Sequence, residues 1–103
     1  MANKTRFTVD IALTEEQYRR IIEAVGDRLY IATDKRSPGI YWLSYESGRG
    51  AEDIYDVLAD IGVTTEIKEE YEGFSSPELS VVFIRPGEWK QVYYQRPANP
   101  FTD

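Results

Sequence analysis

The side chains that most often carry out chemistry in proteins are partly missing from this chain. It has no cysteine and no histidine, so it lacks a thiolate nucleophile, an imidazole base and any metal site built on them. Its eighteen Asp and Glu residues can act in pairs as acid and base or hold a hard cation. No pair stands out by position, and no segment has the spacing of an EF-hand loop. We therefore predict no enzyme activity, no metal and no cofactor.

Residues 46–53, ESGRGAED, raise the question of a phosphate site, because they lie between an apolar run and an amphipathic stretch. A dinucleotide-binding turn needs three glycines. Gly48 and Gly50 supply two of them, but Asp53 occupies the third position. The acidic residues that follow would also repel a phosphate at the start of a helix. The segment is predicted to be a flexible turn whose Ser47 or Gly50 starts the helix, and not a nucleotide loop.

The pattern of apolar residues predicts two helices and six strands. A strand over 7–13 shows alternation, and Thr14 then begins TEEQ, a capping-box pattern. The first helix has an apolar face and ends at Gly26, and the second ends at Gly62. The remaining predicted segments are strands over 28–33 and 39–45 with a turn at 34–38, a helix over 51–61, a strand over 63–71, a loop over 72–78, and strands over 79–85 and 89–95.

The resulting order, β-α-β-β-α-β followed by two strands, predicts an α+β fold. Its first six elements are typical of the ferredoxin-like arrangement, in which two helices cover one face of an antiparallel sheet with strand order 4-1-3-2. The last two strands form a C-terminal β-hairpin extension, which either lengthens the sheet or serves as an arm for a partner. Two other antiparallel α+β arrangements stay open. Residues 1–96 are predicted to form a single domain, and residues 97–103 a flexible C-terminal tail.

The net charge of −6 is concentrated in the middle of the chain, where residues 39–78 carry two Lys/Arg and ten Asp/Glu. Such a block repels nucleic acid and attracts basic surfaces, so we expect no direct nucleic-acid binding. There is no signal segment at the N-terminus and no apolar run long enough to span a membrane. We expect a cytoplasmic protein without membrane contact.

Four carboxylates of the second predicted helix lie opposite its apolar stripe and form a solvent-facing row. Two further residues of interest are an arginine between two glycines, which can pair with a partner's carboxylate, and a tyrosine of the type common in binding hot spots. The candidate partner-binding residues are Tyr45, Arg49, Glu52, Asp53, Asp56, Asp60, Glu69 and Glu70. A solvated helix face is the alternative interpretation of the row.

Aromatic residues also divide between the two faces of the predicted sheet. Trp42 must face the side opposite to Tyr41 and Tyr45, because side chains alternate along a strand. One set is therefore core, and the other lies on the open face or beneath the C-terminal hairpin. Asp10, on the polar face of the first strand, argues against RNA bases stacking there.

Together these patterns favour a small acidic protein-binding module. The hypothesis is an inhibitor or antagonist, of the immunity-protein or virus-encoded anti-defence type. It would dock its acidic patch on a basic surface of a partner protein, with nucleic-acid-binding proteins as one candidate class. The alternative is a small-ligand-binding regulatory domain or a structural subunit, either of them acting as a homodimer through sheet edges or exchanged strands.

Overall fold

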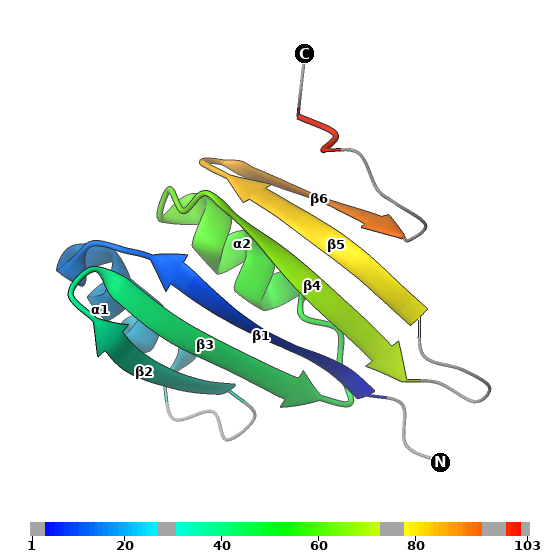
Figure 1. Cartoon of the computed structure of the whole chain (residues 1–103), viewed down its shortest axis with the longest axis horizontal. Helices are drawn as coiled ribbons and strands as arrows, with labels where there is room; N and C mark the ends of the chain where they lie inside the picture. The colour runs from blue at the N-terminus through cyan, green and yellow to red at the C-terminus, as the bar shows by residue number, and fades with distance from the viewer. Residues whose placement is uncertain (1–3, 27–30, 73–77, 94–98, 102–103) are drawn as a thin grey trace.

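The computed structural model describes residues 4–26, 31–72, 78–93 and 99–101. A single antiparallel sheet of six strands forms one layer, and both helices lie against one of its faces (Figure 1). The elements are β1 (Lys4–Ala12), α1 (Glu15–Val25), β2 (Ile31–Ser37), β3 (Ile40–Ser47), α2 (Glu52–Asp60), β4 (Thr65–Glu72), β5 (Glu78–Arg85) and β6 (Glu88–Tyr93). The strand order is β2-β3-β1-β4-β5-β6. The other face of the sheet, which no helix covers, is called the open face below.

The predicted α+β class, with an antiparallel sheet and two helices, is confirmed. The predicted ferredoxin-like sheet does not match the whole arrangement, because the sheet has six strands and its order continues past β4. The physical reason is that β5 pairs with β4 along its full length, from Thr65 opposite Ile84 to Tyr71 opposite Glu78. The hairpin of β5 and β6 therefore lengthens one edge of the sheet.

Helix α1 begins as its sequence predicts. The Thr14 hydroxyl accepts a hydrogen bond from the Gln17 backbone N–H at 3.1 Å, and the Gln17 side chain accepts one from the Thr14 N–H at 3.0 Å. These two bonds satisfy backbone groups that the first turn of a helix leaves without partners. The helix ends before Gly26, whose φ of 60° is costly for other residues.

Helix α2 begins differently from its prediction. Ala51 is the N-cap residue and makes no side-chain capping bond, so neither Ser47 nor Gly50 starts the helix. The Ser47 hydroxyl instead accepts a hydrogen bond from the Arg49 N–H at 3.1 Å. The polar loop residues thus satisfy one another, and the helix starts only where the chain reaches the buried Ala51.

The predicted turn at 34–38 is too long. Strand β2 continues to Ser37, and the turn consists of Pro38 and Gly39, the latter with a φ of 80°. Proline followed by a positive-φ glycine is the usual sequence of a type II turn. Lys35 and Arg36 resemble turn residues because β2 is an edge strand whose side chains are mostly exposed.

The core lies between the sheet and the helices. Strands β1 and β3 contribute aromatic pairs: the Phe7 and Tyr45 rings stack at 5.5 Å, and the Tyr41 ring stacks on Tyr18 of α1 at 4.2 Å. Trp42 lies on the open face, where the Arg36 guanidinium is 5.0 Å from its ring centre. The aromatic side chains of β3 therefore divide as expected, and the buried set is the one beneath the helices. The hairpin does not cover Trp42, because β1 and β4 separate β3 from it.

The C-terminal residues that are described lie near the hairpin of β5 and β6 (Figure 1). The half-buried Phe101 ring lies 4.0 Å from the Arg85 guanidinium and 5.4 Å from the Lys90 ammonium. The rest of the predicted flexible tail lies outside the described residues, as do the predicted strand residues 28–30 and 94–95 and most of the loop predicted over 72–78. Among the described residues, no helix combines the length and the apolar composition needed to cross a membrane.

The Thr14 cap gives a first test of the fold. We expect Thr14→Ala to lower the free energy of unfolding by about 1 kcal/mol, because both capping bonds depend on it. Urea denaturation measures the loss. Thr64→Ala is the control, since the exposed Thr64 makes no hydrogen bond with its side chain among the described contacts. Equal stabilities of the two variants would show that the cap does not hold α1.

Candidate protein-binding surface

The acidic row of α2, formed by Glu52, Asp53, Asp56 and Asp60, is exposed along its whole length. The opposite side of the helix is anchored in the core by buried Ile54, Tyr55, Leu58 and Ala59. No carboxylate of the row forms an ion pair with a lysine or arginine in the described part of the chain. The row is therefore a fixed line of negative charge in which no carboxylate is ion-paired within the described chain.

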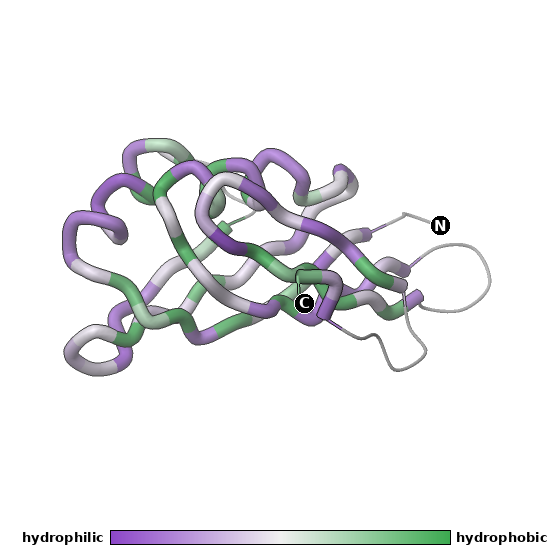
Figure 2. Tube along the Cα trace, turned by 90° about the horizontal axis from the view of Figure 1, so that it is seen from above, coloured by the Kyte–Doolittle hydropathy of each residue, from purple (hydrophilic) through white to green (hydrophobic). Residues whose placement is uncertain are grey.

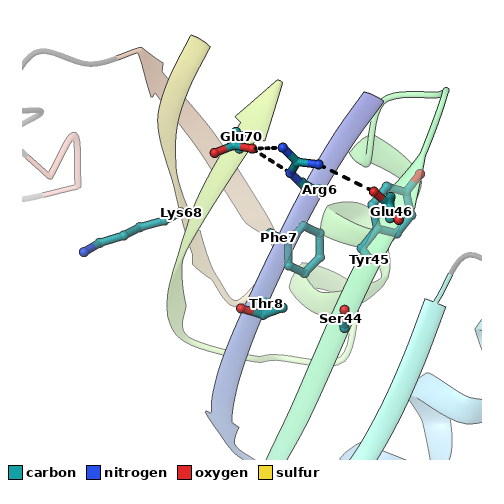
Figure 3. Close-up of a pocket in the computed structure, with 8 residues that line it drawn as sticks. All are labelled: Arg6, Phe7, Thr8, Ser44, Tyr45, Glu46, Lys68 and Glu70. Carbon is teal, nitrogen blue, oxygen red and sulfur yellow. Dashed lines mark hydrogen bonds and ion pairs between the residues drawn. The ribbon is translucent and has the colours of Figure 1, made fainter. Parts of the chain in front are cut away.

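Glu70 lies on the open face, on the opposite side of the sheet from the acidic row. There Arg6 bridges three carboxylates. Its guanidinium donates to Glu70 at 2.6 Å and lies 3.6 Å from Glu46 (Figure 3), and it also donates to Glu72 at 3.0 Å. The hydrogen bond to Glu70, and then its charge, raises the pKa of Arg6 above its usual value. Glu70 is thus paired with Arg6. It is not part of one surface with α2, because its side chain lies on the other face of β4.

Glu69 is buried beneath α2, with 6% of its surface exposed. Its carboxylate accepts hydrogen bonds from the Tyr55 hydroxyl at 2.5 Å, the Gln91 amide at 2.6 Å and the Ser80 hydroxyl at 3.5 Å. Gln91 also donates to the Ser80 hydroxyl at 2.7 Å. This buried Glu69 cluster joins β4 to α2, β5 and β6. Its central residue does not face a partner, contrary to the sequence interpretation, because Glu69 shares a strand face with buried Ile67.

Tyr45 is also buried, with 3% of its surface exposed. Its ring stacks on Phe7, and its hydroxyl donates a hydrogen bond to the Gly50 carbonyl at 3.0 Å. The sequence prediction of a surface anchor therefore does not fit its position, and the alternation of β3 explains why. What Tyr45 does is fix the loop that leads into α2. Arg49 is exposed in that loop, next to the first residues of the acidic row.

Trp89 is a neighbour of the row that sequence reasoning missed. Its indole Nε1 donates a hydrogen bond to Asp56 Oδ1 at 2.7 Å, and its ring meets Tyr55 edge-on at 5.1 Å. A half-buried tryptophan usually finds an acceptor for its N–H, but the sequence does not show which one, because Asp56 lies 33 positions away. Asp56 therefore has a structural role as well as a place in the acidic row.

The described residues offer little for catalysis or metal binding. They contain no group of three or more Asp or Glu side chains placed to hold a metal ion. The hollow drawn in Figure 3, of about 330 Å³, lies on the open face and is lined by Arg6, Thr8, Ser44 and Lys68 among others. The charge of Arg6 is already satisfied there by carboxylates of the chain itself. The expectation of a non-enzymatic protein stays a prediction.

Comparison with family models, with curated proteins and with solved structures finds no match to this chain. Its function must therefore be argued from the geometry alone. Of the eight candidate residues, the structure brings the four carboxylates of α2 together and leaves Arg49 beside them. It separates Tyr45, Glu69 and Glu70 from that surface.

Removing the buried carboxylate should be costly. We expect Glu69→Ala to lower the free energy of unfolding by about 3 kcal/mol, because the buried Tyr55 hydroxyl loses its acceptor and the half-buried Gln91 amide keeps the Ser80 hydroxyl but loses the carboxylate. Urea denaturation of Glu66→Ala supplies the control, since Glu66 is exposed on the same strand. A loss for Glu69→Ala no larger than that of the control would contradict the role of the cluster.

The Tyr55 phenol should make the free energy of unfolding depend on pH in the alkaline range. Burial, and then the hydrogen bond to Glu69, raises the pKa of Tyr55 well above its usual value. An unfolded tyrosine ionises near a pKa of about 10, so above that pH the unfolded chain loses a proton that the folded chain keeps. Stability should therefore be complete below about pH 10 and fall as the pH rises further.

Unfolding free energies measured by urea at a series of alkaline pH values test this dependence. Tyr55→Phe removes the group and should make the fall shallower than in the wild type. Part of the fall should remain, because partial desolvation, and then the charge of Glu69, also raises the pKa of Tyr93, although more than half of this side chain is exposed. Identical slopes for the two proteins would show that Tyr55 does not hold its proton in the folded state.

Proposed function

We propose that this protein is a protein-binding module, and that it acts as an inhibitor or antagonist by docking the acidic row of α2 on a basic surface of a partner protein. One observation carries the proposal. The four carboxylates of the row share an exposed helix face without an ion pair in the described chain, whereas those around Arg6 on the open face are paired. Unpaired charge of one sign attracts and orients a partner of the other sign.

The position of Asp60 supports the same proposal. It is the last residue of α2, and the last turn of this helix carries no basic residue. A negative charge at a helix C-terminus opposes the helix dipole by about 0.3–1 kcal/mol. Glu52 and Asp53, in the first turn, favour the dipole, so stability alone accounts for them. Stability does not account for Asp60, whereas contact with the cations of a partner would account for it.

The spacing of the row points to the class of partner. Glu52, Asp56 and Asp60 repeat every four residues, which places one carboxylate per about 6 Å of helix. A regular line of negative charge resembles the backbone of a nucleic acid, and surfaces that bind nucleic acid present lysine and arginine for such a line. We therefore propose a nucleic-acid-binding protein as the partner, with its basic surface blocked by α2.

We also infer that β1 to β4 and the two helices form a ferredoxin-like unit to which the hairpin has been added. What supports this is the order β2-β3-β1-β4 within the longer sheet and the antiparallel pairing of β1 with both β3 and β4. The proposed contact surface is then the helix layer, on the side away from the open face.

Charge reversal tests the proposed function. The variant Asp53→Lys with Asp60→Lys reverses two charges of the row and spares Asp56, whose bond to Trp89 contributes to stability. We expect wild-type protein fixed to a support to capture a basic protein from lysate at low salt, and to release it as salt rises and screens the contact over about 8–10 Å. The double variant should lose at least tenfold in affinity for that protein.

The matched control is Asp34→Lys with Glu66→Lys. It changes the net charge by the same amount, but both residues are exposed on the open face of the sheet. This control should keep the captured protein. Equal loss of binding in both double variants would mean that net charge, and not the acidic row, is responsible, and equal retention would remove the row from the interface.

A dimer is the second candidate, and one observation favours it. Among the described strands β6 pairs with β5 alone, so its other side is a sheet edge, and Tyr93 at the end of that strand is 62% exposed. Edge strands with exposed aromatic residues can pair with a second copy. An empty eluate from the capture experiment, together with a dimer by size-exclusion chromatography, would favour this candidate.

A further inference from the structure

We propose that the partner of the acidic row contributes an amphipathic basic helix, and that this helix inserts an apolar side chain into the groove between α1 and α2. The inference rests on the proposed function and adds the shape and chemistry of the partner to it. The groove is a hollow of about 330 Å³ with side chains from both helices in its lining. It lies in the helix layer, where Figure 2 shows the two helices on one side of the sheet.

The floor of the groove is apolar. Ala24 of α1 is exposed, and Val57 of α2 and Ile61 just after it are half-buried. These side chains are short, so the helices leave room between them that no side chain of the described chain fills. An apolar side chain of a partner would remove this surface from water, which favours binding.

The rims of the groove carry charge. Asp60 lines the groove and is also the last member of the acidic row, so the two features form one continuous surface. Glu23 lines it from α1, and Arg20 is the basic residue in the lining. Carboxylates therefore stand on both helices that border an apolar floor.

This arrangement selects one kind of occupant. A helix with an apolar stripe between lysines or arginines can lay its stripe in a groove and its charges against the carboxylates. An acidic helix would meet Glu23 and Asp60 with like charge, and a polar basic segment would leave the apolar floor uncovered. The groove therefore distinguishes an amphipathic basic helix from a segment that is merely basic.

Two synthetic peptides serve as probes. The first is a leucine/lysine peptide that forms an amphipathic helix, and the second is the same peptide with every leucine replaced by serine, so that the charge is equal. At low salt we expect the wild type to bind the leucine/lysine peptide about tenfold more tightly than the serine/lysine peptide, the gain from burying one large apolar side chain. Backbone amide signals of Ala24, Val57 and Ile61 should shift with the first peptide only.

Filling the groove should remove this preference. Ala24→Trp places a large side chain over the floor, and the two peptides should then bind within about twofold of each other. Ala24→Met repeats the test should the tryptophan variant unfold, because methionine is a better helix former than tryptophan. The matched control, Ala32→Trp, adds the same side chain at an exposed alanine of β2 and should keep the tenfold preference.

The outcomes separate this inference from the proposed function. Equal wild-type affinities for the two peptides, or a preference that survives both Ala24 variants, would show that the groove does not bind the apolar side chain. The proposed function would still stand if both peptides bound and the double reversal at Asp53 and Asp60 abolished binding. If neither peptide bound the wild type at low salt, both the groove and the proposed function would be overturned.

Discussion

The buried carboxylate of Glu69 is the interaction on which the arrangement of the C-terminal half depends. It accepts hydrogen bonds from α2, β5 and β6 at one point, and among the described residues its donors are neutral side chains and not lysines or arginines. A carboxylate is expensive to bury, so each of these donors is needed. The cluster therefore specifies how the hairpin and α2 lie against β4. The placement of α2 in turn determines where the acidic row faces.

This division of the carboxylates between structure and surface explains why a chain with a net charge of −6 is not uniformly acidic. Glu69 is satisfied inside, and the carboxylates around Arg6 are paired on the open face. Among the described exposed carboxylates that form no ion pair, four stand in one row on α2, whose apolar side is anchored in the core, whereas the other four lie singly on α1, β2, β4 and β5. A rigid line of charge loses little conformational entropy on binding, which makes it better suited to a partner than the same charges on a loop.

Local patterns in the sequence predicted local structure well. The TEEQ motif predicted the start of α1, and alternation predicted β1 and most of β4, because each depends on residues a few positions apart. The same alternation could have shown that two of the candidate partner-binding residues are buried. Glu69 shares its strand face with Ile67, and Tyr45 shares its face with Tyr41. A polar residue in phase with apolar ones is buried with them, and its partners then come from other strands. The bond from Trp89 to Asp56 could not be predicted, since it depends on where the hairpin joins the sheet.

Asp60 lowers the stability of α2 and also lies in the proposed binding surface. As the last residue of α2 it opposes the helix dipole, and it stands where the acidic row meets the apolar groove. A substitution to lysine or asparagine there would favour the helix and leave the core untouched. The chain therefore keeps at this position a residue that is unfavourable for the free protein. Under the proposed function, contact with a cation on a partner would offset this cost, and the adjoining groove would take an apolar side chain of the same partner.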